Sequence, residues 1–317
     1  MKRYRSWTGA LLLALPLALL LAPASVLAQE QKAQPRPARP ADVENAAYGP
    51  HERNVLDLYK AKSERPTPLV VFIHGGGFVG GDKRGVAVAL LEACLENGIS
   101  VASINYRYST QAPYPGPMHD GARAVQFLRS KAREWNLNPK AFAASGGSAG
   151  AGMSLWIGFH DDMADGAGSD PVKRQSTRLS AMGVIGAQSS YDPRTIEKLI
   201  GLSAAKHPAL ETLYGLKGEE LKTARAYRLF EDASPITHLS AGDPPVFMFY
   251  SEPNEPLPPD AKPGAGIHHP RFGFFLKERM DKLGIECQVR LREEYGGDRT
   301  PQMFRDMVAF FQKYFPK

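Results

Sequence analysis

The chain has 317 residues, of which 43% are hydrophobic and 23% charged. This length suffices for one large domain, and this composition excludes a disordered or fibrous chain. The formal net charge of +6 includes three cations within the first 28 residues, and without them it is +3. So small a bias favours neither nucleic acid nor a membrane surface as a partner. The only cysteines, Cys94 and Cys287, lie in apolar segments, and we expect two buried free thiols.

The N-terminus has the organisation of an export signal. A basic start, "MKRYR", precedes the apolar run "ALLLALPLALLLA", and "VLA" then ends at residue 28. This order predicts a signal peptide over residues 1–28, with an uncleaved anchor as the alternative. We therefore expect a periplasmic or secreted protein, without membrane attachment after cleavage. The proline-rich stretch that follows predicts a linker over residues 29–45 and a folded domain over residues 46–317.

From residue 54 onward, strand-like and helix-like segments alternate. The strand-like segments are "NVLDLYK", "PLVVFIHGGGF", "ISVASINYR", "KAFAASGG", "LSAMGVIGAQ", "PPVFMFY" and "IECQVRLREEY". The segments with helical spacing are "GVAVALLEACLENG", "HDGARAVQFLRSKAREW", "AGAGMSLWIGFH", "FGFFLKERMDKLG" and "QMFRDMVAFFQKYF". Repeated β-then-α units predict an α/β fold with a mostly parallel, twisted sheet and helices on both of its faces.

Residues 192–234 interrupt this alternation. The segment contains no clear strand, and it has the pattern of several short helices. An insertion at this point follows the carboxyl end of a strand, which is the edge where open α/β sheets bind ligands. We therefore predict that residues 192–234 form a small helical cap over the functional site.

The pentapeptide Gly146-Gly147-Ser148-Ala149-Gly150 lies between a predicted strand and a predicted helix. A serine between small residues in this context is typical of a nucleophile elbow, a strained turn that exposes the serine hydroxyl. The backbone N–H of Ala149 would face an oxyanion at the start of the helix. The alternative is a glycine-rich turn with an uninvolved serine.

A second glycine motif, His74-Gly75-Gly76-Gly77, ends an earlier strand. Consecutive glycines allow backbone N–H groups to turn toward a ligand. We expect Gly76, Gly77 and Ala149 to form an oxyanion hole, with His74 orienting the loop. The sequence has neither a metal-ligand spacing of Cys and His nor a GxxxxGK[ST] phosphate loop, so we expect no metal and no cofactor.

Together with "LDLYKAK", "VASINYRYS" and "DASPITHLSAGDPPV", these motifs resemble the HGGG branch of the α/β-hydrolases. This branch comprises carboxylesterases similar to hormone-sensitive lipase and to small bacterial feruloyl and acetyl esterases. The resemblance extends over residues 55–311. It implies hydrolysis of a carboxylic ester by a serine, an acid after the "PPVFMFY" strand and a histidine after the last strand. A small-molecule or carbohydrate-linked ester as substrate is likewise implied only by the resemblance.

The sequence departs from the family at the base. After the last strand, "EEYGGDRTPQM" has Asp298 where the resemblance places histidine, and no histidine follows His269. His268 and His269, in "GAGIHHPRFG", are the candidate replacements, because their loop starts at the edge of the sheet that holds Ser148. The alternative is a pair of surface histidines. His119 and His238 have structural interpretations.

The acid is also atypical. Within "SEPNEPLPPD", Asn254 aligns best with the acid of the family, and Glu255 is one residue away. An asparagine can orient a histidine but cannot stabilise an imidazolium by charge, whereas Glu255 could do both.

We therefore expect a serine hydrolase of carboxylic esters. Its catalytic residues would be Ser148, His269 or His268, and Glu255 or Asn254. The activity would be weak if no base had been relocated, because an oxyanion hole and substrate binding alone leave about a thousandfold catalysis. The main alternative is a catalytically degraded α/β-hydrolase-fold protein that binds a ligand without turnover. A serine peptidase is a weaker alternative. The sequence leaves the oligomeric state open.

Overall fold

The computed structural model describes residues 39–297 and 300–316. The predicted signal peptide and most of the predicted linker lie outside the described residues. The sheet already begins at Val43, so the predicted boundary of the linker at residue 45 is wrong. The strand Val43–Ala47, of sequence VENAA, is an edge strand that is exposed or half-buried along its length. Such a strand lacks the apolar alternation by which strands are recognised.

The described residues form a single eight-stranded sheet with the order β1-β2-β4-β3-β5-β6-β7-β8. β2 pairs antiparallel with β1 and β4, and all other neighbours pair parallel. The strands are β1 Val43–Ala47, β2 Val55–Tyr59, β3 Thr67–Ile73, β4 Ser100–Ile104, β5 Leu137–Gly147, β6 Ala181–Ile185, β7 Val246–Tyr250 and β8 Cys287–Leu291. The predicted α/β class with a mostly parallel sheet is thus confirmed.

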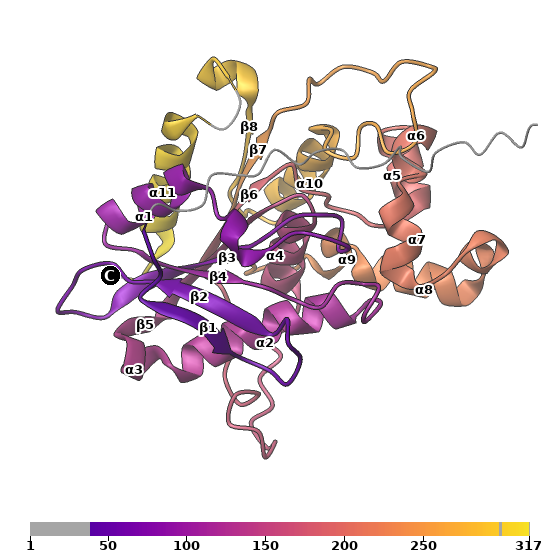
Figure 1. The fold of residues 1–317 in the computed structure, drawn as a ribbon. Helices are drawn as coiled ribbons and strands as arrows, with labels where there is room; N and C mark the ends of the chain where they lie inside the picture. Colours follow the sequence, from indigo (N-terminus) through magenta and orange to yellow (C-terminus); the bar gives the residue numbers. More distant parts are fainter. Residues whose placement is uncertain (1–38, 298–299, 317) are drawn as a thin grey trace, which may run out of the picture. The chain divides into compact units, whose positions relative to one another are not determined.

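Helices connect the strands and flank the sheet (Figure 1). The α-helices are α1 Val88–Glu96, α2 Gly116–Ser130, α3 Ala132–Trp135, α4 Ala149–Phe159, α5 Pro193–Leu199, α6 Leu202–Ala205, α7 Pro208–Tyr214, α8 Ala224–Ala233, α9 Pro235–His238, α10 Arg271–Lys282 and α11 Pro301–Tyr314. Three short 3₁₀ helices are η1 Lys83–Gly85, η2 Gly218–Lys222 and η3 Arg292–Tyr295. The single helix that we expected over residues 119–135 is divided, because α2 ends at Ser130 and α3 begins at Ala132.

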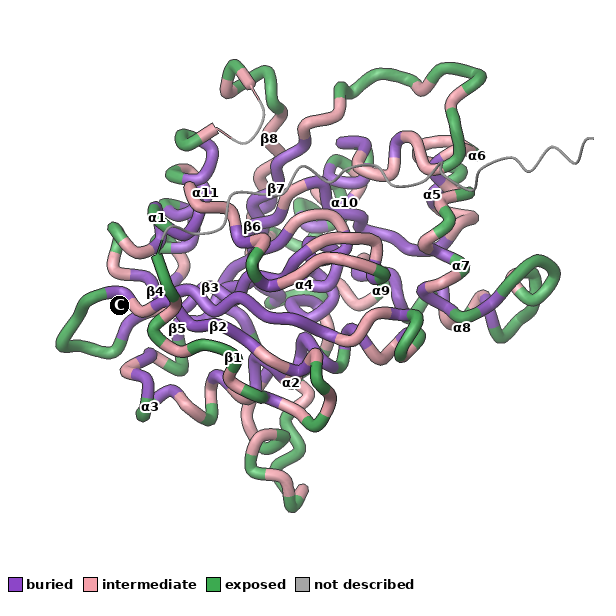
Figure 2. Tube along the Cα trace, viewed as in Figure 1, coloured by how far each residue is buried: buried purple, intermediate pink, exposed green. Residues whose placement is uncertain are grey.

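The buried side chains form two cores, one on each face of the sheet. Along β3, Leu69 and Val71 belong to one core, and Val70 and Phe72 belong to the other. Successive residues of a strand point to opposite faces, so a strand buried on both faces must be apolar throughout. Figure 2 shows this buried centre in purple. Helices α2, α4 and α10 cover the first face, and α1 and α11 cover the second.

Both cysteines are free and buried, as predicted. Cys94 belongs to the core under α1, and Cys287 belongs to the core on the opposite face. Burial raises the pKa of the Cys287 thiol to about 12, so the thiol form persists at neutral pH. Within the described ranges, none of the helices is both long and apolar enough to cross a membrane.

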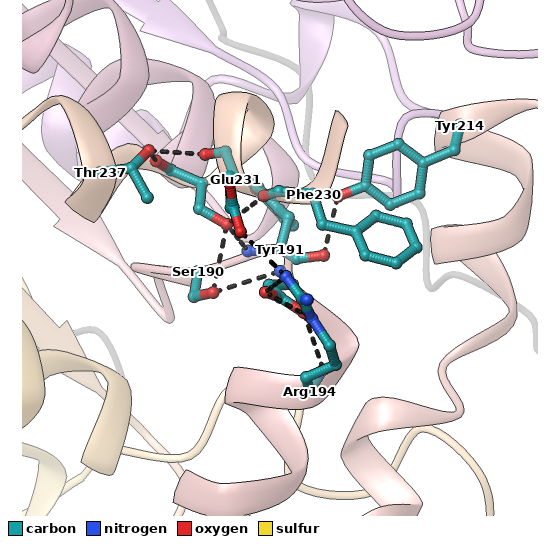
Figure 3. A network of polar contacts seen from close by, with 9 residues as sticks. Ser190, Tyr191, Arg194, Tyr214, Phe230, Glu231 and Thr237 are labelled. Atoms are coloured by element: carbon teal, nitrogen blue, oxygen red, sulfur yellow. Dashed lines mark hydrogen bonds and ion pairs between the residues drawn. The ribbon is translucent and has the colours of Figure 1, made fainter. Parts of the chain in front are cut away.

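The residues between β6 and β7 form helices α5 to α9, and α5 to α8 lie together away from α1 and α11 (Figure 1). A polar network anchors them (Figure 3). Arg194 at the start of α5 pairs with Asp192 at 2.7 Å and with Glu231 of α8 at 3.2 Å. The Tyr214 hydroxyl at the end of α7 donates to the backbone oxygen of Tyr191 at 2.7 Å. These contacts join α5, α7 and α8 to the segment that leaves β6.

Candidate active site

Ser148 lies at a sharp turn between β5 and α4. Its backbone has φ 53° and ψ −121°, a conformation that few non-glycine residues adopt and that strains the chain. Its N–H donates to the oxygen of Ile185 at the end of β6 (2.9 Å), which fixes the turn against the sheet. A Cβ at Gly150 would lie 2.0 Å from the oxygen of Ile73, so only glycine fits there. The small residues around Ser148 therefore permit the close approach of β3 to this turn.

The loop after β3 lies directly against Ser148. A Cβ added to Gly75 would be 2.7 Å from the oxygen of Gly147 and 3.3 Å from Cβ of Ser148. Gly76 and Gly77 have φ angles of 111° and 59°, so the backbone turns through the left-handed region beside the serine. This arrangement places Gly75 against the turn of Ser148, and Gly76 and Gly77, two of the residues expected to form the oxyanion hole, follow directly in the chain.

The side chain of His74 bonds the backbone of this loop. Its Nδ1 lies 2.8 Å from the oxygen of Gly75, and its Nε2 lies 3.3 Å from an Arg53 nitrogen. An arginine only donates, so Nε2 accepts and Nδ1 carries the proton that is donated to Gly75. Burial lowers the pKa of His74 to about 4, which keeps this ring neutral. His74 also stacks on Tyr106, with ring centroids 4.3 Å apart.

Arg53, in the turn between β1 and β2, contacts both ends of the glycine loop. Besides His74, it donates to the oxygen of Gly81 at 3.3 Å and to the oxygen of Tyr106 at 2.7 Å. Its guanidinium carbon lies 3.7 Å from the ring centroid of Tyr108. Sequence reasoning missed this residue, because nothing local to Arg53 indicates the loop that it supports.

The structure brings His268 to Ser148. Nε2 of His268 lies 2.8 Å from the Ser148 hydroxyl oxygen, within hydrogen-bond distance. On the other side of the ring, Nδ1 lies 3.6 Å from a carboxylate oxygen of Glu252. That distance is in ion-pair range but exceeds a direct hydrogen bond. With its proton on Nδ1, facing Glu252, the ring accepts a hydrogen bond from the serine through Nε2.

The other residues proposed for the base and the acid lie elsewhere. His269 is buried, and its Nε2 bonds the backbone oxygen of Glu255 at 2.8 Å, so it braces the loop instead of contacting Ser148. The acidic side chain found beside His268 is that of Glu252, and neither Glu255 nor Asn254 takes this place. Asp298 lies outside the described residues. Glu252 precedes the aligned position by two residues, and its charge in the loop after β7 was the only signal that could have identified it.

His119 and His238 gather around Trp156 of α4, with ring centroids 6.2 Å and 5.8 Å from the indole. His238 also bonds the backbone oxygen of Asp232 at 2.6 Å. Both rings therefore lie beside Trp156 of α4, where His119 of α2 is exposed and His238 of α9 is half-buried. In the part of the chain that the structure describes, no group of His, Cys, Asp and Glu is arranged to hold a metal ion.

The loop between β7 and α10 carries both His268 and Glu252, and it is tied to α6. The N–H of Gly264 donates to the oxygen of Ser203 at 2.8 Å, and the Ser203 hydroxyl donates to the oxygen of Ala265 at 3.4 Å. In Figure 1 this loop, drawn in orange, runs from β7 to α6 before it returns to α10. The position of His268 therefore depends on the helices between β6 and β7.

Comparison with known sequences identifies relatives of this chain. The model of the BD-FAE family matches residues 56–261. "Probable carboxylic ester hydrolase LipM" of Mycobacterium tuberculosis is 30% identical over 219 residues, which are 67% of this chain and 48% of that protein. "Esterase LipQ" of the same organism is 26% identical and covers 70% of this chain and 51% of its own length. The chain thus spans about half the length of these curated relatives.

Among solved structures, a "truncated form of carbohydrate esterase from gut microbiota" superposes with a TM-score of 0.64. The match covers 87% of this chain and 98% of that one, at 19% sequence identity. At so low an identity, the likeness is one of fold. The strand order and this likeness together make the fold that of an α/β-hydrolase.

Proposed function

Because the chain belongs to the BD-FAE family, we propose that it is a carboxylic ester hydrolase with Ser148 as its nucleophile. One observation carries the proposal: Nε2 of His268 lies 2.8 Å from the hydroxyl of a serine held in a strained elbow. A serine hydroxyl becomes a competent nucleophile when a base at this distance removes its proton. Glu252 supplies the negative charge that favours the imidazolium.

The reaction follows from these positions. The Ser148 oxygen attacks the ester carbonyl carbon while its proton moves to Nε2 of His268. The carbonyl oxygen becomes an oxyanion, which the N–H groups of Gly76, Gly77 and Ala149 stabilise. Collapse of this intermediate expels the alcohol, which takes the proton from His268. Water then attacks the acyl-serine in the same way and releases the carboxylic acid.

The proposed substrates are small or carbohydrate-linked carboxylic esters. The names of the curated relatives support an ester as substrate. The carbohydrate esterase among the solved neighbours supports an ester whose alcohol is a carbohydrate. We also propose that the protein acts after export, on the basis of its N-terminal sequence.

Hydrolysis of p-nitrophenyl acetate tests the roles of the residues. Ser148→Ala and His268→Ala should each reduce kcat by about 10⁴-fold or more, and the double variant should lose little beyond either one, because such groups act as a unit. Glu252→Gln should reduce kcat by about tenfold to a hundredfold, whereas the matched change Glu255→Gln should leave it within about twofold. The smaller effect follows from the 3.6 Å separation of Glu252 from the ring.

His269→Gln is the control for its neighbour and should keep most of the activity of the wild type, since its ring bonds a backbone oxygen. A wild type with no turnover, and no labelling of Ser148 by a fluorophosphonate, would show instead a protein that binds a ligand without hydrolysing it.

A further inference from the structure

His207 precedes α7 and has one ring nitrogen fixed by the backbone. The N–H of Ala209 donates to Nδ1 of His207 at 3.2 Å. Nδ1 is therefore an acceptor, and in the neutral ring the proton lies on Nε2. Among the described residues, Nε2 of His207 has no hydrogen-bond partner. Every buried side-chain nitrogen and oxygen of the described residues does have a partner, so Nε2 is not buried and is open to solvent. His207 thus presents one unused N–H donor.

Two contacts on different elements place this ring at the site. Cβ of Ala209 lies 3.2 Å from where a Cβ of Gly77 would be, so the start of α7 covers the oxyanion loop. Gly264, in the loop that carries His268, would bring a Cβ to within 3.0 Å of the His207 ring. The imidazole therefore lies against the loop that carries His268, and Ala209, two residues further along, packs against Gly77 of the oxyanion loop.

The charge of His207 agrees with this placement. Burial lowers the pKa of His207, and the proximity of His268 lowers it further. Near neutral pH the ring is therefore uncharged. A neutral N–H donor pairs well with a neutral oxygen, such as that of a hydroxyl or an ether.

We propose that His207 binds the alcohol portion of the ester through a hydrogen bond from Nε2–H to an oxygen beside the ester linkage. The inference rests on the proposed function. His268 must reach the leaving oxygen to return its proton, so the alcohol lies on the side of His268, where His207 is also found. The structure therefore favours esters of polyhydroxylated alcohols, such as acetylated sugars, over esters of simple alcohols.

A pair of esters that differ by one hydroxyl tests the proposal. Trans-2-hydroxycyclohexyl acetate has an oxygen next to the ester linkage, and cyclohexyl acetate has hydrogen there. His207→Phe keeps an aromatic ring without a donor, and His207→Gln keeps an N–H donor. For the hydroxy ester, His207→Phe should lower kcat/KM about tenfold, the effect of one lost hydrogen bond. For cyclohexyl acetate the loss should stay below about twofold, and His207→Gln should restore most of the selectivity.

Equal losses for both esters would overturn the proposal, because His207 would then support the fold or the position of His268. No loss for either ester would also overturn it. If the wild type hydrolyses neither these esters nor p-nitrophenyl acetate, the proposed function fails. The role of His207 is then tested by measuring the binding of an alcohol. Titration of trans-1,2-cyclohexanediol into Ser148→Ala should then shift the Nε2 resonance of His207, and cyclohexanol should not. An unmoved resonance would overturn the inference independently of catalysis.

Discussion

Arg53 supports the glycine loop after β3, which we propose as the oxyanion hole. Its bonds to His74 and to the oxygen of Gly81 join the two ends of the loop. Arg53→Met should therefore reduce kcat for p-nitrophenyl acetate about tenfold and leave KM nearly unchanged, because misplaced donors weaken stabilisation of the transition state. Arg123→Met is the control, since Arg123 bonds the oxygen of Tyr48 in the same region without contacting the loop. Equal kcat values for the two variants would refute this role.

The neutral state of His74 makes stability depend on pH. Its pKa of about 4 in the folded protein lies below the ordinary 6.5, so between these values the unfolded chain binds more protons. The free energy of unfolding should therefore fall as the pH drops from about 6.5 toward 4, by about 2 kcal/mol between pH 7 and pH 5 for this group. Urea titrations of wild type and His74→Gln measure the contribution as a difference in slope. Parallel pH profiles would contradict it.

Among single residues, the sequence could predict those whose positions are determined by their immediate neighbours in the chain. Ser148 and the glycines after His74 lie in short motifs whose backbone demands are met by neighbouring residues. His268 was one of two candidates, and only the tertiary position of its ring distinguishes it from His269. Glu252 could not be chosen, because the course of the proline-rich loop after β7 decides which carboxylate reaches the ring.

Among the elements, the loop between β7 and α10 is the one whose shape governs the site. Gly264 has φ 91°, a conformation that costs any other residue about 1 kcal/mol or more, and it faces the ring of His207. Gly264→Ala should therefore lower kcat about tenfold by moving the segment that carries His268.

Gly242→Ala is a closely matched control for Gly264→Ala. Gly242 has φ 90°, and a Cβ added there would contact nothing within 4 Å. The two variants should lose similar amounts of thermal stability, whereas only Gly264→Ala should lose activity. Similar kcat values in both would show that this loop does not control the base.

The elements themselves could be predicted where they are apolar. β3 is almost entirely buried and apolar, and so is the part of β5 from Ala141 to Ala144, and these parts of the two strands followed from the sequence. β1 could not be found, because its half-buried apolar residues Val43 and Ala46 are three positions apart across an irregularity in the pairing, so the alternation with period two is lost. The division of the predicted helix at Lys131 was missed because the amphipathic pattern continues through this residue.

For the molecule as a whole, the prediction that stays open is export. We expect the mature chain to begin near Gln29, because a basic start, an apolar run and "VLA" precede it. Mass spectrometry of protein recovered from the periplasm or the medium of a bacterial host should give this N-terminus. A mature chain that still begins at Met1 would contradict the prediction, and Ala28→Arg should block the processing.

The segment between β7 and α10 has one more consequence. It carries His268 and Glu252, the two proposed partners of Ser148. Exchange of this segment between related proteins would therefore exchange both residues at once. Neither of these proposed partners comes from β8, η3 or α11. We therefore expect that transplanting this one segment transfers both residues to a related protein, provided that the recipient protein also has a helix at the position of α6 to which the segment can bond.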